Sequence, residues 1–123
     1  MIDRKDAAVN FLKLIVSGRI DEAYRLHVDF KGKHHNPFFQ AGFPALQEGM
    51  TENHVEYPNK RIAAKHVLGD GDLVAVHSHL VMVPGEKEFA TVHLFRFQGD
   101  RIVEMWDIGL PLPVDSPNED KAF

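Results

Sequence analysis

Between Arg61 and Ile108 the sequence contains four strand-like segments joined by three short turns, and this spacing constrains the fold more than any other feature. Turns of this length can join only neighbouring antiparallel strands, because a parallel connection needs a dozen or more residues. We therefore expect an antiparallel meander. Its expected strands are 61–68, 73–83, 88–97 and 101–108, separated by turns at 69–72, 84–87 and 98–100.

The residues before Pro58 are typical of helices. The expected helices span residues 3–17, 21–27 and 44–54. The first is supported by Asp3 and Asp6, which resemble a capping box, and the third by Pro44 in its first turn. Residues 28–35 are expected to be irregular or extended. Helices followed by a meander indicate an α+β fold, in which a curved antiparallel sheet wraps around the N-terminal helices like a cone and encloses a pocket.

Composition narrows the function classes. A length of 123 residues fits one domain, residues 1–123, with residues 114–123 as a loosely held tail. A net charge of −4 argues against a nucleic-acid partner, and the sequence has no apolar run long enough to cross a membrane. The N-terminus lacks the apolar region of a secretory signal, so a cytoplasmic protein is expected. With no cysteine, thiolate metal sites and cysteine nucleophiles are excluded.

Asp107 is the most unusual residue of the expected strands. It follows the only tryptophan in a segment that otherwise alternates like a half-buried strand, where a carboxylate is unfavourable unless it is paired or functional. His93 lies on the preceding strand, and a carboxylate beside an imidazole can transfer protons in a small-molecule pocket. The alternative is a partly exposed strand end that carries a structural ion pair.

Whether Asp107 and His93 share a face depends on the length of one loop. If the loop is Gln98-Gly99-Asp100, odd-numbered residues oppose odd-numbered residues and both side chains line the same face. If the loop is only Gly99-Asp100, His93 shares its face with Trp106, and Asp107 points away unless a bulge restores the parity. The sequence leaves both possibilities open.

Two further clusters contain polar groups suited to a site. His77 and His79 lie on one side of a strand, where a metal could bind if His93 or Asp107 supplied a third ligand. His35 and Asn36 lead into aromatic residues, as at the rim of a cavity, although a plain Asn-Pro turn would give the same pattern. We predict that Asp107 and His93 are catalytic and that the following residues contact the substrate: His35, Asn36, Phe39, His79 and Trp106.

Several segments together resemble the SnoaL-like polyketide cyclases of the nuclear-transport-factor-2-like (NTF2-like) superfamily. They are His35-Asn-Pro37, Gly71-Asp-Leu-Val-Ala-Val-His77, Leu94-Phe-Arg-Phe97, Arg101-Ile-Val-Glu-Met-Trp-Asp107 and the tail from Leu110-Pro-Leu-Pro113 to Phe123.

This resemblance implies a cone-shaped barrel with a deep apolar pocket and a homodimer formed through the open sheet face. It also implies an intramolecular aldol condensation without metal or cofactor. An aspartate on the last long strand would be the acid and base, assisted by a histidine on the strand before it. Asp107 and His93 match these positions. The sequence departs from its most similar branch at His93, where a carboxylate is frequent, and at Met105, where a histidine is frequent.

The expected function is therefore a cyclase- or isomerase-type reaction on a small apolar carbonyl compound, with proton abstraction by the Asp/His pair. A fold does not define a function, so two alternatives stay open: a non-catalytic small-molecule-binding domain of the same fold, and a metal-dependent enzyme.

Overall fold

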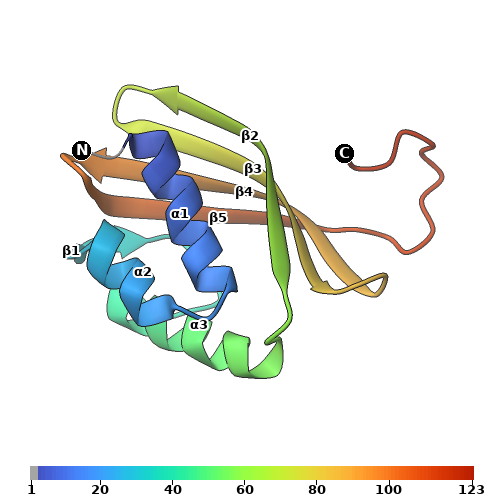
Figure 1. Cartoon of the computed structure of the whole chain (residues 1–123), viewed down its shortest axis with the longest axis horizontal. Helices are drawn as coiled ribbons and strands as arrows, with labels where there is room; N and C mark the ends of the chain where they lie inside the picture. Colours follow the sequence, from blue (N-terminus) through green and yellow to red (C-terminus); the bar gives the residue numbers. More distant parts are fainter. Residues whose placement is uncertain (1–2) are drawn as a thin grey trace.

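The computed structural model describes residues 3–123, which form three helices and a five-stranded sheet (Figure 1). The helices are α1 (Arg4–Val16), α2 (Ile20–His27) and α3 (Phe43–Glu56). The strands are β1 (Val28–His34), β2 (Arg61–Asp70), β3 (Leu73–Val83), β4 (Lys87–Gln98) and β5 (Arg101–Pro111).

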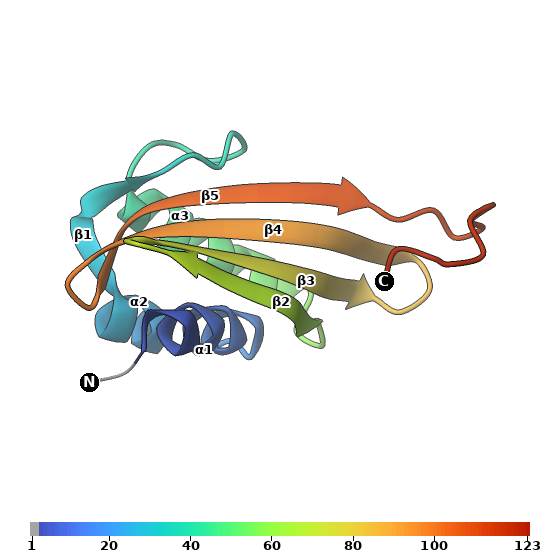
Figure 2. The ribbon, with the colours of Figure 1, turned by 90° about the horizontal axis from the view of Figure 1, so that it is seen from above.

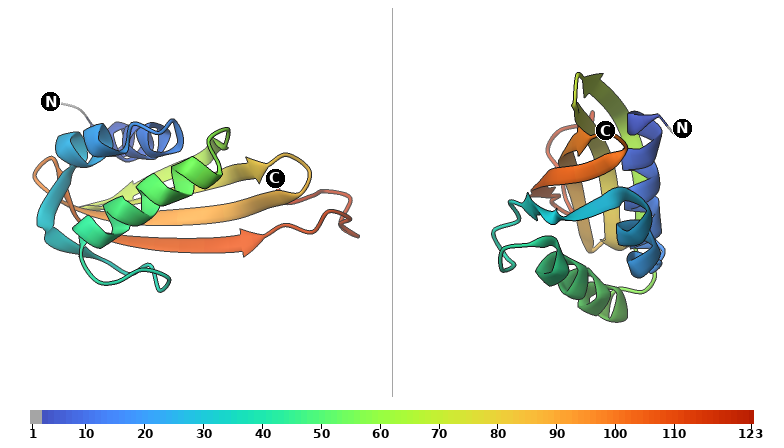
Figure 3. Two further views of the ribbon diagram at one scale, coloured as in Figure 1. Left: turned by 90° about the horizontal axis from the view of Figure 1, so that it is seen from below. Right: turned by 90° about the vertical axis from the view of Figure 1, so that its left-hand side faces the viewer.

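The sheet has the strand order β1-β5-β4-β3-β2, and strands β2 to β5 form the expected antiparallel meander. All three helices lie on one face of the curved sheet, which we call the concave face (Figures 2 and 3). The opposite face is called the outer face. The predicted α+β fold, with a curved sheet around N-terminal helices, is confirmed.

Strand β1 is the element that the sequence did not assign. It pairs in parallel with β5, and its register shifts between Val28 and Lys33. Only its two end residues, Val28 and His34, are buried. The segment therefore lacks the regular apolar alternation by which a strand is recognised.

The core joins helices to strands through aromatic side chains. Asp3 caps α1, because its carboxylate accepts a hydrogen bond from the Lys5 N–H at 2.7 Å. The Phe11 ring of α1 packs edge-on against Tyr24 of α2 and Phe95 of β4, with ring centroids 5.4 and 5.8 Å apart. These contacts fix α1 and α2 over the middle of the sheet.

The β4–β5 hairpin resolves the register that the sequence left open. Its loop is the two-residue one, Gly99-Asp100, since Gln98 pairs with Arg101. Gly99 has a φ of 61° in the first loop position, where a tight hairpin turn favours glycine. The register then shifts, because Phe97 pairs with Ile102 and Arg96 with Glu104, which leaves Val103 as an extra residue. This bulge restores the parity, so His93 lies directly opposite Asp107.

The C-terminal end reaches the outer face, where the Phe123 ring stacks on His79 with centroids 4.7 Å apart. Within residues 3–123, none of the helices combines the length and the apolar character that crossing a membrane would require.

Candidate functional site

Asp107 and His93 both point to the concave face. On β4 and β5 this face carries the core residues Phe95 and Met105, and His93 and Asp107 lie two positions further along the same strands. His93 Nε2 is 3.5 Å from Asp107 Oδ1, and the two side chains are only 17% and 22% exposed. A carboxylate and an imidazole therefore meet where the buried core begins.

Asn36 holds the second oxygen of Asp107. Its Nδ2 donates a hydrogen bond of 2.7 Å to Asp107 Oδ2. Asn36 is itself fixed by its neighbours, because its Oδ1 accepts from the Phe38 N–H at 3.0 Å and its backbone N–H donates to His34 Nδ1 at 3.1 Å. Since His34 Nδ1 accepts, the ring proton lies on Nε2, which donates to the Gln40 carbonyl at 2.7 Å. The loop after β1 thus orients the Asp107 carboxylate.

Tyr24 adds a group that sequence reasoning missed. The ring is completely buried on α2, and burial, followed by the charge of Asp107, raises the pKa of its phenol. Tyr24 Oη, His93 Nδ1 and Asp107 Oδ1 are all buried and have no hydrogen-bond partner among residues 3–123. The same is true of His54 Nδ1 and Ser78 Oγ, so an unpartnered atom does not by itself mark a binding place, although buried polar atoms are normally hydrogen-bonded.

His93 is held neutral by its surroundings. Burial lowers the pKa of His93, and the nearby charge of Asp107 opposes this effect only in part. With a carboxylate facing Nε2, electrostatics favours the tautomer that carries its proton there and leaves Nδ1 as an acceptor. His93 can therefore steady the Asp107 carboxylate through Nε2 while Nδ1 faces a bound molecule.

His35 and Trp106 lie on the outer face, away from Asp107. Their rings stack with centroids 4.9 Å apart, and His35 Nε2 is 2.6 Å from Glu104 Oε2. This contact with His35 is the main reason that the pKa of Glu104 is lowered. Side chains alternate along β5, so Trp106 and Asp107 necessarily point to opposite faces.

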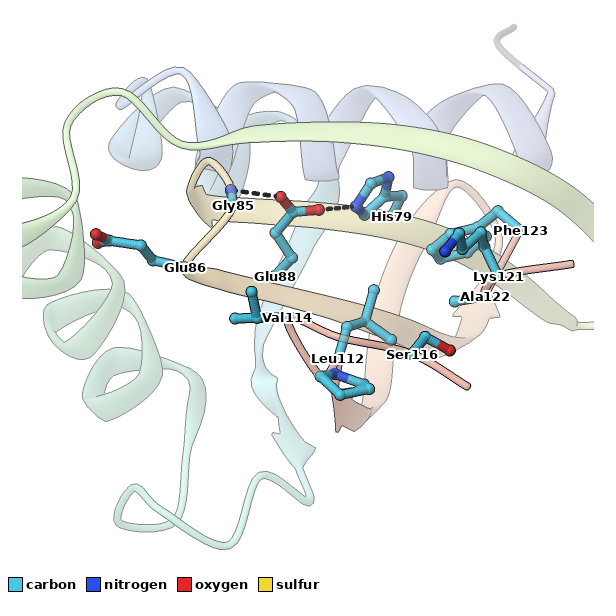
Figure 4. A pocket seen from close by; sticks show the side chains of 11 residues that line it. His79, Gly85, Glu86, Glu88, Leu112, Val114, Ser116, Lys121, Ala122 and Phe123 are labelled. Carbon is cyan, nitrogen blue, oxygen red and sulfur yellow. Dashed lines mark hydrogen bonds and ion pairs between the residues drawn. The ribbon is translucent and has the colours of Figure 1, made fainter. Parts of the chain in front are cut away.

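His79 also lies on the outer face, in a pocket of about 380 Å³ between the β3–β4 hairpin and the C-terminal segment (Figure 4). Its Nε2 is 2.6 Å from Glu88 Oε1. Gly85 and His79 together lower the pKa of Glu88 by hydrogen bonding to its carboxylate. The structure does not bring His79 together with Asp107 or His93.

The alternative of a histidine metal site requires side chains that the structure separates. His77 Nδ1 is 2.9 Å from His66 Nδ1 on the outer face, whereas His93 and Asp107 point to the concave face. Among residues 3–123, no group of three or more histidine or acidic side chains is arranged to hold a metal ion.

Phe39 packs against the hydrophobic core beside α3, where the absence of a side chain at Gly49 makes room for its ring. Two other pockets also lie apart from the Asp/His pair. One of about 760 Å³ lies beside the start of α1, and one of about 10 Å³ separates α1 from Val76 and Ser78. Within residues 3–123, neither these two nor the outer-face pocket has Asp107 or His93 in its lining.

Comparison with solved structures defines the class of fold. The structure has the NTF2-like, or cystatin-like, fold and resembles SnoaL-like polyketide cyclases at low sequence identity. No protein-family model matches the sequence, and a search of curated proteins found no match.

Three solved structures illustrate the similarity. An NTF2-like protein of unknown function from Cytophaga hutchinsonii has a TM-score of 0.72 at 12% identity, over 89% of this chain and 92% of that one. An uncharacterized cystatin-fold protein from Novosphingobium aromaticivorans has a TM-score of 0.74 at 15% identity, over 88% and 99%. A SnoaL-like polyketide cyclase from Agrobacterium tumefaciens has a TM-score of 0.70 at 17% identity, over 89% and 93%.

Proposed function

We propose that this protein is a cyclase- or isomerase-type enzyme that abstracts a proton from a small apolar carbonyl compound. The observation that carries the proposal is the Asp107 carboxylate, which accepts a hydrogen bond from Asn36 and lies opposite His93. One oxygen of Asp107 is held by Asn36, and the other faces His93 at the edge of the apolar core. That is the arrangement of an oriented base, with one oxygen that makes no hydrogen bond within residues 3–123.

In the proposed reaction, Asp107 Oδ1 takes a proton from the carbon next to a carbonyl group. The electrons of the C–H bond form the enolate double bond, and the carbonyl electrons move to oxygen. In a cyclase, the enolate carbon attacks a second carbonyl carbon of the same molecule, and a C–C bond forms. The resulting alkoxide takes the proton back from the carboxyl group of Asp107. Atoms and electrons balance without a metal or an organic cofactor.

Asn36 and His93 have distinct roles in this scheme. Asn36 keeps the Asp107 carboxylate in one orientation, which lowers the entropy cost of reaching a reactive geometry. His93 lies next to the reacting oxygen and, as a neutral ring, does not neutralise the base by forming a full ion pair. A small apolar molecule would approach from the solvent side of the concave face, where both side chains are partly exposed.

The experiment is exchange of carbon-bound hydrogen for deuterium, measured by proton NMR with 1-tetralone in D₂O. The protein should accelerate exchange next to the carbonyl, and Asp107→Asn should lose about 100-fold or more of the acceleration, as expected for a general base. Asp115→Asn, which removes an exposed carboxylate of the C-terminal segment, should behave like the native protein. Equal exchange rates for native protein and Asp107→Asn contradict the proposal.

A non-catalytic binding domain is the alternative function, and the outer-face pocket of about 380 Å³ favours it because this pocket lies away from the Asp/His pair. Titration of 1-tetralone against the protein separates the two possibilities. Binding without exchange supports the binding domain, and binding with exchange that needs Asp107 supports the enzyme.

We also propose a homodimer formed through the outer face. Ile108 and Leu110 point to this face from β5 and are 57% and 63% exposed, and neighbouring exposed apolar side chains are typical of protein interfaces. Analytical ultracentrifugation should show a dimer that Ile108→Lys converts to monomers. Val55→Lys, at an exposed apolar position on α3, is the matched control and should leave the dimer intact. A native protein that sediments as a monomer would exclude the dimer.

A further inference from the structure

The outer-face pocket between the β3–β4 hairpin and the C-terminal segment has the properties of a separate binding site (Figure 4). Its volume of about 380 Å³ falls within the range of roughly 300–1,000 Å³ that is usual for small-molecule sites. The apolar part of its lining is Leu112, Pro113, Val114, Ala122 and Phe123. The pocket therefore has the size and the apolar walls that a small organic molecule needs, and its polar groups decide which molecule fits.

Phe123 is the aromatic wall of this pocket, and three side chains of the sheet hold its ring. It stacks on His79 with centroids 4.7 Å apart and lies 5.3 Å from the His77 ring. Lys65 Nζ lies 5.5 Å from the centre of the same ring, within the reach of a cation–π contact. These contacts anchor the C-terminal segment to β2 and β3, so the pocket is enclosed by groups that are fixed against the sheet.

Glu88 is the polar group that the structure fixes at this pocket. Its Oε2 accepts a hydrogen bond from the Gly85 N–H at 2.8 Å, and its Oε1 is 2.6 Å from His79 Nε2. Figure 4 shows the His79 and Glu88 side chains pointing toward each other. These hydrogen bonds lower the pKa of Glu88, so the carboxylate is ionised at neutral pH. Each carboxylate oxygen has two lone pairs and can accept one more hydrogen bond.

The charges around the pocket favour a neutral ligand. Glu86 and Lys121 also belong to the lining, but both are exposed and of opposite sign, so water screens them and their effects largely cancel. Lys65, on the far side of the aromatic wall, adds a further positive charge that disfavours a cation. Glu88 then remains as a fixed acceptor beside apolar walls. It is complementary to a hydrogen-bond donor on an apolar body.

We infer that the outer-face pocket binds an uncharged aromatic molecule with an N–H or O–H group, such as an indole or a phenol. The N–H or O–H group donates a hydrogen bond to the Glu88 carboxylate, and the aromatic ring packs against Phe123 and the apolar side chains of the lining. Binding forms and breaks no covalent bond. The inference does not depend on the proposed reaction, because neither Asp107 nor His93 lines this pocket.

The direct test compares indole with benzofuran, which has the same shape but no N–H group. Binding is followed by NMR titration of the ¹⁵N-labelled protein, in which the Gly85 amide reports on the Glu88 carboxylate. Indole should bind with a Kd of about 1 mM or below, a modest affinity for a ligand of this size. Benzofuran should bind about tenfold or more weakly, since it cannot donate to a charged acceptor. Equal affinities for the two probes overturn the inference.

A substitution at the acceptor tests the hydrogen bond. Glu88→Gln keeps the size of the side chain and removes its charge, so indole should bind about fivefold or more weakly while benzofuran is unaffected. The matched control is Glu86→Gln, which removes a carboxylate of the same hairpin turn and should leave the affinity for indole unchanged. Native affinity for indole in Glu88→Gln overturns the inference.

A substitution at the aromatic wall tests the pocket itself. Phe123→Ala should weaken both indole and benzofuran, because both lose the same ring contact. Phe38→Ala is the control, since this ring is 88% exposed on the loop after β1 and does not line the pocket. The urea midpoint of Phe123→Ala, measured alongside, shows that the variant is folded. A folded Phe123→Ala that binds both probes like the native protein overturns the inference.

The same titration separates this inference from the other proposals. Asp107→Asn should bind indole as the native protein does. If indole binds and Asp107→Asn retains exchange of 1-tetralone, only the proposed function fails. Indole is titrated into both the native protein and Ile108→Lys, so that a dimer through the outer face cannot hide the pocket. If neither protein binds indole, the inference is overturned, whatever the exchange experiment shows.

Discussion

At the scale of single residues, Asn36 makes the contact on which the orientation of Asp107 depends. We predict that Asn36→Ala destabilises the protein by about 1–3 kcal/mol, since Asp107 Oδ2 loses the donor that now lies 2.7 Å away in a partly buried site. The loss should appear as a lower urea midpoint with an unchanged slope. Asn118→Ala, which alters an exposed turn of the C-terminal segment, is the control. An unchanged midpoint for Asn36→Ala would mean that solvent replaces this hydrogen bond fully.

Single residues also show where prediction from sequence stops. Asp107 and His93 could be selected because a carboxylate and an imidazole are rare on alternating apolar strands. Tyr24 could not, because a tyrosine beside Ala23 and Leu26 has the pattern of an ordinary apolar helix face. Whether its hydroxyl finds a partner depends on packing between α2 and the sheet, which no spacing encodes.

At the scale of elements, β1 and the bulge at Val103 depend on each other. A side chain at Gly32 would collide with the Val103 carbonyl oxygen and with the Phe43 ring. Only glycine therefore lets β1 approach the bulged part of β5, and the loop that carries Asn36 follows directly from β1.

We predict that Gly32→Ala destabilises the protein by about 1–3 kcal/mol, the usual range for overpacking, because a backbone atom blocks the added methyl group. Gly109→Ala is a matched control on β5, where the nearest atom to an added methyl would be Thr91 Cγ2 at 4.0 Å. This second variant should be neutral or slightly more stable. Denaturant unfolding of both variants provides the measurement, and equal stabilities would show that β1 can move away without loss.

The hairpin explains why the predicted site residues fall on two faces. The sequence showed that one residue more or less in the β4–β5 connection decides whether Asp107 joins His93 or points away. The structure supplies the extra residue as a bulge within the strand, not as a third loop residue. The bulge at Val103 lies beside the irregular pairing with β1, where Val28 pairs with Ile102 and Lys33 with Glu104. Residue type alone groups His35, His79 and Trp106 with Asp107. The strand register places His79 and Trp106 on the outer face, and His35 lies there because its ring stacks on Trp106.

At the scale of the whole molecule, the fold is predictable because the turn lengths, the helical periodicity and the apolar surfaces all indicate the same arrangement. Short turns require a meander, the N-terminal periodicity requires helices, and the helices have one large apolar surface to cover, the concave face of the sheet. The enclosed pocket expected from the cone shape is a different matter, because none of the three pockets described above is lined by Asp107 or His93. The size of such a pocket depends on how far the helices cover the long strands β4 and β5, which extend beyond them in Figure 2.

The buried histidines make stability of the whole molecule sensitive to acid. Burial lowers the pKa of His27, an effect that Arg101 strengthens and Asp100 opposes, and burial also lowers the pKa of His93 against the opposing charge of Asp107. Both values lie below the ordinary histidine value of 6.5. Just below pH 6.5 the unfolded chain therefore binds protons that the folded chain does not. Unfolding therefore takes up protons in this pH range. The contribution of the two neutral histidines to the free energy of unfolding is complete above pH 6.5 and is lost as the pH falls.

We predict that the urea midpoint decreases between pH 7.5 and pH 5, and that His27→Gln and His93→Gln each flatten this dependence, because glutamine takes up no proton on unfolding. The lowered pKa values of Glu88 and Glu104 act in the same direction but at lower pH, since their contribution is lost only as the pH falls below the ordinary value of 4.5. The two effects are therefore separated by pH. The prediction is wrong if the urea midpoint does not change from pH 7.5 to pH 5, or if neither substitution alters its dependence on pH. Either result would show that the pKa values of these histidines are the same in the folded and unfolded protein.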